Sequence, residues 1–368
     1  MVSSLSHVAH VAGMVGFILI CLVGQIVGRP LPVTPIELPR DDGFLLTPVQ
    51  WWYWTGHLQT RTNQTFGFEY CFFIVEGLVN LVQVAVTDVG LQKFSYLEDL
   101  QVVLDVRKMN ISSGYFDLVS QSGVQGAKGG NGADNLRFQV GDYSVKLGLQ
   151  SSKPPAEHYK GKAHPYSFGG FTYYYSRTAM NVLAGSTMTN TKTGEELSLT
   201  GTSWFDRQWG DLAHAVLQGW QWFAIELNDN IQLMLFDFLA DDTEKYGSVT
   251  LPDGSTVDLA GANFAVTVLS NWTSPASKCT YPASWAVDLV GVPGIPDQTI
   301  LVTPKVADQE LRVLDSPTYW EGACYVEPMQ QATSMTTGGS EVSGSGSINN
   351  GGASGQAYVE HNGFCKKL

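Results

Sequence analysis

The feature that most constrains the fold is a two-residue alternation of side chains in short segments. Large apolar residues occupy every second position over residues 66–72, 82–86 and 143–149. Such alternation is typical of a β-strand with one buried face. No long run has apolar residues at helical spacing, and the abundant aromatic residues and 39 glycines favour strands and turns. The sequence therefore predicts an all-β protein with few, short helices.

The chain divides into two parts near Gly210. A strand-rich stretch, residues 44–210, precedes a Trp-rich stretch, residues 211–368, and each is long enough for one β-barrel or β-sandwich domain. A proline-rich arm, residues 29–43, leads into the first part. Residues 123–135 and 336–355 are rich in glycine and are predicted to form loops. We therefore expect two consecutive β domains.

The first 28 residues have the composition of a secretory signal peptide. No Asp, Glu, Lys or Arg precedes Arg29, and the apolar run of residues 11–27 is short for a bilayer span. We expect a secreted or lumenal protein with no stable membrane span after cleavage; an uncleaved membrane anchor is the alternative. Three Asn-X-Ser/Thr sequons agree with this location and predict glycosylation at Asn63, Asn110 and Asn271.

The cysteine count also fits an exported chain. Without Cys21 of the signal segment four cysteines remain, and an even number predicts two disulfides with three possible pairings. The alternative is four buried free thiols. The four residues are Cys71, Cys279, Cys324 and Cys365.

Charge and motifs exclude several classes of function. The net charge of −13 gives no broad attraction for nucleic acid, so no nucleic-acid partner is expected. The chain has no GxSxG elbow, no P-loop, no dinucleotide fingerprint at a strand–helix junction and no HExxH motif. The sequence therefore predicts neither a cofactor nor a metal site.

Aromatic side chains with isolated polar groups gather in four blocks, residues 50–58, 201–210, 219–227 and 319–322. A shorter stretch of the same kind follows at residues 357–360. A wall of rings with a few polar groups suits a large apolar ligand that carries a few oxygens. For any single Trp, core packing is the competing interpretation, and His57 also fits a structural or surface role. The predicted ligand contacts are Trp51, His57, Glu69, Trp209, Trp220, Trp222, Trp320 and Glu360.

Two charged residues are candidates for chemistry. Asp237 shares a strand face with Ile231, Leu233 and Leu235. Desolvation on such a face would raise the pKa of its carboxyl, which could then act as an acid. A structural carboxylate paired with Arg207 or another donor is the alternative. Arg207 itself could hold a ligand carbonyl or could pair with the neighbouring Asp206.

These blocks, in this order and together with Tyr281-Pro282 and Trp285, resemble the AttH-like and carotenoid 1,2-hydratase (hydroxyneurosporene synthase) family over residues 44–364. The resemblance implies two consecutive lipocalin-like β-barrel or β-sandwich domains, with a ligand cavity in or between them. The hydratase branch adds water to an isoprenoid double bond with an acid and no cofactor. Its essential His, Trp and Asp correspond to Arg207, Trp209 and Asp237, and arginine cannot replace histidine as a proton shuttle.

A second branch is closer in character: exported fungal hetero-Diels–Alderases that join a tropolone-derived quinone methide to a humulene-type terpene. This resemblance predicts a cofactor-independent pericyclase for a hydrophobic polyketide or terpenoid substrate of secondary-metabolite (meroterpenoid) biosynthesis. Arg207 would donate to the substrate carbonyl, with Tyr53 and Tyr175 as further candidates.

Two alternatives to the pericyclase remain open. One is an isoprenoid hydratase or cyclase with Asp237 as general acid. The other is a non-catalytic lipocalin-like carrier of hydrophobic small molecules. All three functions lead us to expect a ring-lined cavity large enough for a terpenoid.

Overall fold

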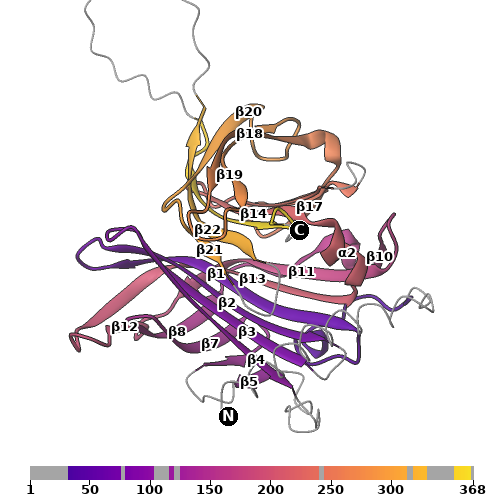
Figure 1. Ribbon diagram of the computed structural model, residues 1–368. Coiled ribbons are helices and arrows are strands. Elements are labelled where there is room, and N and C mark those ends of the chain that lie inside the picture. Colours follow the sequence, from indigo (N-terminus) through magenta and orange to yellow (C-terminus); the bar gives the residue numbers. More distant parts are fainter. Residues whose placement is uncertain are drawn as a thin grey trace, which may run out of the picture.

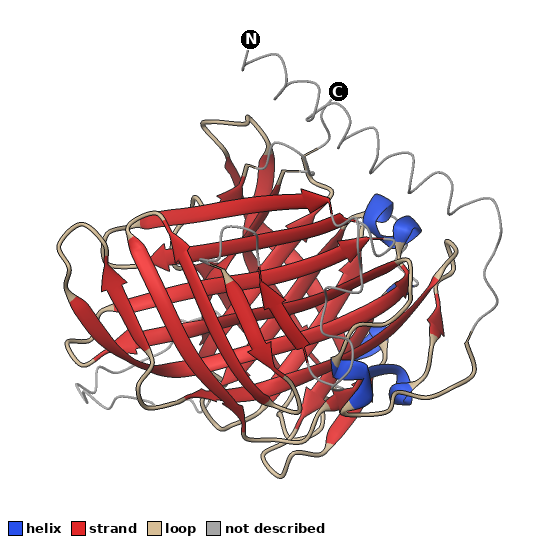
Figure 2. Ribbon diagram, turned by 90° about the horizontal axis from the view of Figure 1, so that it is seen from below, coloured by secondary structure: helices blue, strands red, loops and turns tan. Residues whose placement is uncertain are grey.

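The computed structural model describes residues 32–75, 79–102, 116–119, 125–239, 244–312, 318–329 and 352–365. The predicted signal segment, Asn110 and most of residues 336–355 lie outside the described residues. The described chain forms two antiparallel sheets of thirteen and ten strands (Figure 1). Nearly all of its regular secondary structure is strand (Figure 2). None of the described helices has the length and hydrophobicity that a membrane crossing requires.

The first sheet has the neighbour order β4-β3-β2-β1-β13-β11-β8-β7-β6-β5, with β9, β10 and β12 paired at its side. A 3-10 helix, η2 (Arg40–Asp42), precedes it, and η4 (His158–Gly161) follows β9. The strands are β1 (Val49–Thr60), β2 (Thr65–Val75), β3 (Val79–Asp88), β4 (Lys93–Val102), β5 (Phe116–Val119), β6 (Gly126–Gly129), β7 (Ala133–Val140), β8 (Tyr143–Ser151), β9 (Ala156–Glu157), β10 (His164–Pro165), β11 (Phe171–Val182), β12 (Thr187–Asn190) and β13 (Glu196–Asp211).

The second sheet follows the short helix α2 (Ala213–Gln218) and has the order β17-β16-β15-β14-β23-β22-β20-β19-β18, with β21 paired to β22. A 3-10 helix, η6 (Gly261–Asn263), lies before β18. The strands are β14 (Trp220–Leu227), β15 (Gln232–Phe238), β16 (Tyr246–Thr250), β17 (Thr256–Leu259), β18 (Phe264–Thr273), β19 (Thr280–Leu289), β20 (Gln298–Pro304), β21 (Glu310–Leu311), β22 (Tyr319–Pro328) and β23 (Gly355–Asn362).

One predicted loop is wrong. Residues 126–129 and 133–135, inside the glycine-rich stretch 123–135, belong to β6 and β7. The glycines instead make the turn between these strands, because Gly130 and Gly132 have φ angles of 121° and 81°. Residues with a side chain rarely adopt such angles, so the glycine signal marks a tight hairpin here.

Each sheet encloses its own apolar core, and a third apolar cluster lies between the two sheets. In Figure 1, β14 and β22 of the second sheet lie above β1 and β13 of the first. The period-2 geometry of a strand sends alternate side chains to these different places. Along β1, Trp52 and Trp54 enter the first core, whereas Trp51 and Tyr53 reach the cluster between the sheets. We call this third cluster the interdomain cluster.

Close backbone approach and polar contacts hold the sheets together. A Cβ atom on Gly67 of β2 would lie 2.6 Å from the Cβ of Ala323 on β22, so only glycine fits there. Nearby, the Thr87 hydroxyl donates a 2.7 Å hydrogen bond to Oε1 of Gln309. These contacts fix the relative position of the strands that line the space between the sheets.

The prediction of two disulfides is only half right. Cys279 and Cys365 form a disulfide, which ties the β18–β19 turn to the end of the described chain. Cys71 and Cys324 are buried free thiols. They do not meet, because Cys71 belongs to the interdomain cluster whereas Cys324 points into the second core. Of the predicted glycosylation sites, Asn63 and Asn271 are exposed.

Candidate functional site

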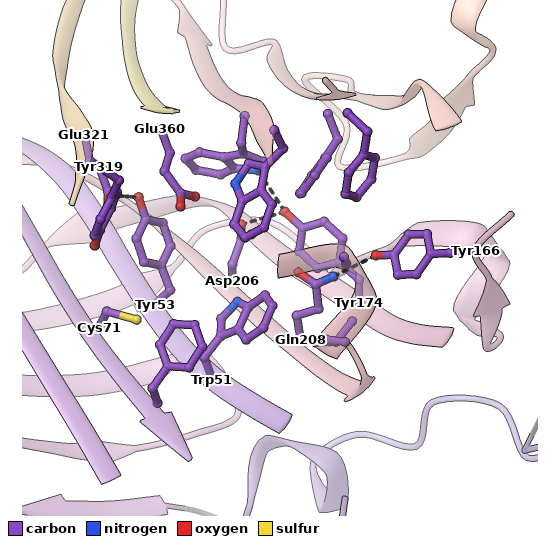
Figure 3. Close-up of a pocket in the computed structure, with 17 residues that line it drawn as sticks. Trp51, Tyr53, Cys71, Tyr166, Tyr174, Asp206, Gln208, Tyr319, Glu321 and Glu360 are labelled. Atoms are coloured by element: carbon purple, nitrogen blue, oxygen red, sulfur yellow. Dashed lines mark hydrogen bonds between the residues drawn. The ribbon is translucent and has the colours of Figure 1, made fainter. Parts of the chain in front are cut away.

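A pocket lies inside the interdomain cluster, with walls from both sheets (Figure 3). On the first sheet, the rings of Trp51 and Phe73 stack with their centroids 4.8 Å apart. On the second, Trp220 packs against Phe236 at 5.8 Å. Further rings come from Tyr166, Tyr174, Trp222, Phe238 and Tyr319. The walls are therefore mostly aromatic, as the sequence blocks predict.

The pocket is smaller than expected. The centres of water molecules can occupy about 50 Å³ of it. One water needs roughly 10–15 Å³ of such space, so the pocket has room for roughly four water molecules. The interdomain pocket therefore does not hold a whole terpenoid in this conformation, because rings from the two sheets pack against one another. Tyr53, for example, meets Trp222 edge-on with the centroids 5.5 Å apart. The space suits an end group of a ligand.

Two carboxyl groups face each other at one end of the pocket. Glu321 of β22 lies directly opposite Glu360 of β23 in the register of the sheet, and the Tyr53 hydroxyl donates a hydrogen bond to Oε1 of Glu321. Burial, followed by the charge of Glu360, raises the pKa of Glu321 well above its usual range. Burial also raises the pKa of Glu360 to about 7. Near neutral pH, Glu321 thus keeps its proton while Glu360 gains and loses one.

Asp206 brings a third carboxyl group from the first sheet. It accepts hydrogen bonds from the Ser176 hydroxyl at 2.5 Å, the Tyr174 hydroxyl at 2.6 Å and the Trp204 indole at 2.7 Å. Burial raises the pKa of Asp206 to about 7, and the three hydrogen bonds act in the opposite direction. The Trp222 indole in turn donates to the Tyr174 hydroxyl at 3.1 Å. This chain of donors links the second sheet to Asp206.

Glu69 lies on the same face of β2 as Cys71, a residue of the pocket wall. Its side chain is fully buried, and neither carboxyl oxygen has a hydrogen-bond partner among the described residues. Burial, together with the charges of Glu360 and Glu98, raises the pKa of Glu69 to about 8. Glu69 is therefore protonated at neutral pH and borders the Glu321–Glu360 pair.

Comparison with known proteins identifies the family. The family model described as AttH-like matches residues 29–364. The chain belongs to the AttH-like family. It matches no curated protein. Its structure is similar to that of an AttH protein from Nitrosomonas europaea, with a TM-score of 0.73 and 22% identity over 92% of this chain and 100% of that one. It is also similar to kievitone hydratase from Nectria haematococca, with a TM-score of 0.66 and 13% identity over 90% and 93% of the two chains.

At these identities the two solved structures show a shared fold. They confirm the predicted all-β architecture of lipocalin-like type, and the family match confirms the predicted AttH-like resemblance.

The structure does not bring Arg207 to the pocket of this AttH-like protein. Its side chain is fully buried and points into the first core, where it donates to the carbonyl of Gly43 at 2.7 Å and to Oε1 of Gln50 at 2.8 Å. Its guanidinium also lies 3.9 Å from the ring centre of Trp52. Burial lowers the pKa of Arg207 to about 10, so it stays charged at neutral pH. The expected contact with a ligand carbonyl is therefore replaced by structural contacts.

Tyr175 and Trp209 share this inward orientation. The Tyr175 hydroxyl donates a hydrogen bond to Asp42 of η2, inside the first unit. Trp209 stacks on Tyr173 at 5.2 Å and borders a separate hollow of about 450 Å³ beneath the N-terminal arm. Neither residue lines the interdomain pocket, and their predicted roles toward a ligand stay predictions.

Asp237 and Trp320 point into the second unit. Asp237 follows Leu233 and Leu235 along one face of β15, as predicted, but that face lines the second core. Its carboxylate lies 3.8 Å from Nζ of Lys245. Trp320 packs against His361 in the same core, with ring centroids 5.5 Å apart. Asp237 therefore does not line the interdomain pocket, and its role as an acid stays a prediction.

His57 lies between the sheets but away from the pocket wall. Its Nδ1 is 3.1 Å from Nζ of Lys305, and this contact joins β1 to the second unit. Burial and then the positive charge of Lys305 lower the pKa of His57 well below its usual range. His57 is therefore a neutral interface residue, which agrees with the structural interpretation left open from the sequence.

The prediction also missed residues that the structure places in the pocket. Tyr174, Asp206 and Glu321 lie there, and the last two belong to aromatic blocks recognised in the sequence. The signal that locates them is the alternation of side chains between the two faces of a strand. On β13, Asp206 and Trp204 point to the interdomain cluster, whereas Arg207 points to the opposite face. Of the predicted residues, Trp51, Tyr53, Trp220, Trp222 and Glu360 do line the pocket.

Proposed function

We propose that this protein is an enzyme of hydratase type that adds water to a double bond at the end of a hydrophobic small molecule. The observation that carries the proposal is the Glu321–Glu360 pair at the end of an aromatic pocket. Two neighbouring carboxyl groups whose pKa values differ supply an acid and a base at the same pH. A solved structure of the same fold is a hydratase, which supports this class of reaction.

The proposed chemistry balances with the groups present. Glu321 gives its proton to one carbon of the double bond, and the other carbon becomes positively charged. A water molecule adds to that carbon, and Glu360 takes the proton that the water releases. Glu321 is then ionised and Glu360 protonated, so a proton moving from Glu360 to Glu321 restores the starting state. The Tyr53 hydroxyl, bound to Glu321, stabilises its ionised form during turnover.

The pocket volume supports an alkene end group as the reacting part. About four water molecules' worth of space accommodates a branched group of a few carbons and one water. The remainder of a larger ligand would extend out of the pocket, which is partly open. Burial of such an end group among rings contributes about 25 cal/mol for each Å² of apolar surface removed from water.

A pericyclase remains the second candidate, because the stacked Trp51–Phe73 wall can hold a flat conjugated partner. The donor to its carbonyl would be the protonated carboxyl of Glu321 in place of Arg207. A carrier function requires the same walls and no chemistry.

Product mass separates the three functions. A panel of prenylated phenols and terpenoid alkenes is incubated with the protein in ¹⁸O-labelled water. Hydration predicts a product heavier by one labelled water, a pericyclic reaction predicts an isomer of unchanged mass, and a carrier predicts binding without conversion. Glu321→Gln and Glu360→Gln should each abolish the labelled product, whereas Glu196→Gln, at an exposed position of β13, should retain it. Equal labelled product from all variants would refute the assignment of the pair.

We further propose that the protein passes through the secretory pathway and carries glycans at Asn63 and Asn271. The Cys279–Cys365 disulfide and the exposure of both asparagines support this. Enzymatic deglycosylation of the protein from its native source should lower its mass, and an unchanged mass would refute it.

A further inference from the structure

The interdomain pocket has an unusual balance of charge. Three of its wall residues are acids, Asp206, Glu321 and Glu360, and none of the described wall residues is Lys, Arg or His. The rest of the wall is mainly aromatic, and the face of an aromatic ring attracts positive charge. Within the described residues, nothing in the pocket wall neutralises these carboxyl groups when they ionise.

A second observation concerns buried polar groups behind the wall that have no hydrogen-bond partner among the described residues. The buried carboxyl of Glu69, beside Cys71 of the wall, leaves both oxygens without a hydrogen-bond partner among the described residues. The hydroxyl of Tyr358 is also buried and also has no hydrogen-bond partner among the described residues. The charges of Glu321 and Glu69 both act on Tyr358, so these groups form one cluster behind the wall. Buried polar groups normally have partners, and a positive charge in the adjacent pocket would favour the ionised forms of these carboxyl groups.

We propose that the pocket binds the head group of a small organic cation of the ammonium class, held between aromatic faces and the carboxyl groups of Glu321, Glu360 and Asp206. The inference deepens the proposed function, because the same surroundings would stabilise the positive charge that a protonated double bond develops. A trimethylammonium group matches the available volume in size.

Binding of such a cation is coupled to proton release. Several titratable groups face the pocket or stand directly behind its wall. They come from β1, β2, β4, β11, β13, β22 and β23 and from the loop before β11. These groups are Tyr53, Glu69, Cys71, Glu98, Tyr166, Tyr174, Asp206, Tyr319, Glu321, Tyr358 and Glu360. These are acids, phenols and a thiol. His158 also stands behind the wall, with its Nε2 2.7 Å from the Ser176 hydroxyl that binds Asp206, but burial lowers its pKa to about 3 and keeps it neutral. A cation therefore favours the ionised forms of the acids. A carboxyl with a pKa near 7 is about one-tenth ionised at pH 6 and almost fully ionised at pH 8.5. Affinity for a cation should therefore rise about tenfold over this range.

The test compares choline with its neutral isostere 3,3-dimethylbutan-1-ol by titration calorimetry on the full protein. Choline should bind about tenfold tighter at pH 8.5 than at pH 6 and tighter than the isostere at pH 8.5, whereas the affinity for the isostere should not change with pH. Equal affinities for the two compounds, an affinity for choline that does not vary with pH, or no binding of either compound would overturn the inference.

Variants tie the effect to the carboxyl groups. Glu360→Gln and Asp206→Asn should each weaken choline binding at pH 8.5 and flatten its pH dependence, whereas Glu196→Gln should match the wild type. Near-ultraviolet circular dichroism checks that each variant keeps its packing. The outcome is separable from the proposed function: choline binding without hydration of any alkene would leave the cation site standing, and hydration without preference for choline over the isostere would remove it.

Discussion

Glu69 provides a sharp test of the electrostatics between the two sheets. Burial raises its pKa from about 4.5 to about 8, so the folded protein holds a proton that the unfolded chain releases. The stability that this proton contributes is complete below pH 4.5 and is lost as the pH rises through 8. Each pKa unit corresponds to about 1.4 kcal/mol, so the loss between pH 4.5 and pH 8 is on the order of 5 kcal/mol.

Glu69→Gln removes this dependence, because glutamine has nearly the same shape and no titrating proton. We expect the variant to unfold at a denaturant concentration close to that of the wild type at pH 5 and at a clearly higher one at pH 8. The free energy of unfolding is measured by urea denaturation at half-unit pH steps, with Glu196→Gln as the control for a surface acid. The buried acids that do not interact with Glu69 contribute equally to both proteins and cancel. A difference between Glu69→Gln and wild type that stays constant from pH 5 to pH 8 would refute the reasoning.

Three further predictions concern the supports of the site. Arg207→Met should lower the free energy of unfolding by about 3–5 kcal/mol, because it removes a buried charge from its carbonyl partners; a loss below 1 kcal/mol would contradict the structural role. Gly67→Val should cost about 1–3 kcal/mol through its clash with Ala323 and should weaken choline binding, and unchanged binding would argue against the close contact. Reduction of the Cys279–Cys365 disulfide, which spans 86 residues, should cost about 4–5 kcal/mol in urea denaturation; coincident curves for the oxidised and reduced protein would disprove this.

The strands were predictable because side-chain alternation is local. Residues 66–72, 82–86 and 143–149 lie in β2, β3 and β8, as expected. The family blocks also predicted the aromatic walls. A lone charged residue on an apolar strand face, as with Asp237, does mark a buried side chain, but it does not say which of several buried spaces that side chain enters.

The alternation of side chains between the two faces of a strand explains why several predicted residues do not line the interdomain pocket. β1, β11, β13, β14 and β15 are buried on both faces, one in a domain core and one in the interdomain cluster. Their two faces therefore carry equally apolar residues, and the usual contrast of an inner and an outer face disappears. Arg207 and Asp206 differ by one position, and this single step separates a core residue from a pocket residue. Only the packing of one domain on the other distinguishes the two faces.

The central claim is that carboxyl groups between the sheets hold protons at neutral pH. Infrared difference spectroscopy measures this directly, since a protonated carboxyl has a C=O band that ionised groups lack. At pH 7 the wild-type protein should show this band for buried acids, and the band should lose intensity in Glu321→Gln and in Glu69→Gln but not in Glu196→Gln. A wild-type spectrum at pH 7 without any protonated carboxyl band would contradict the claim.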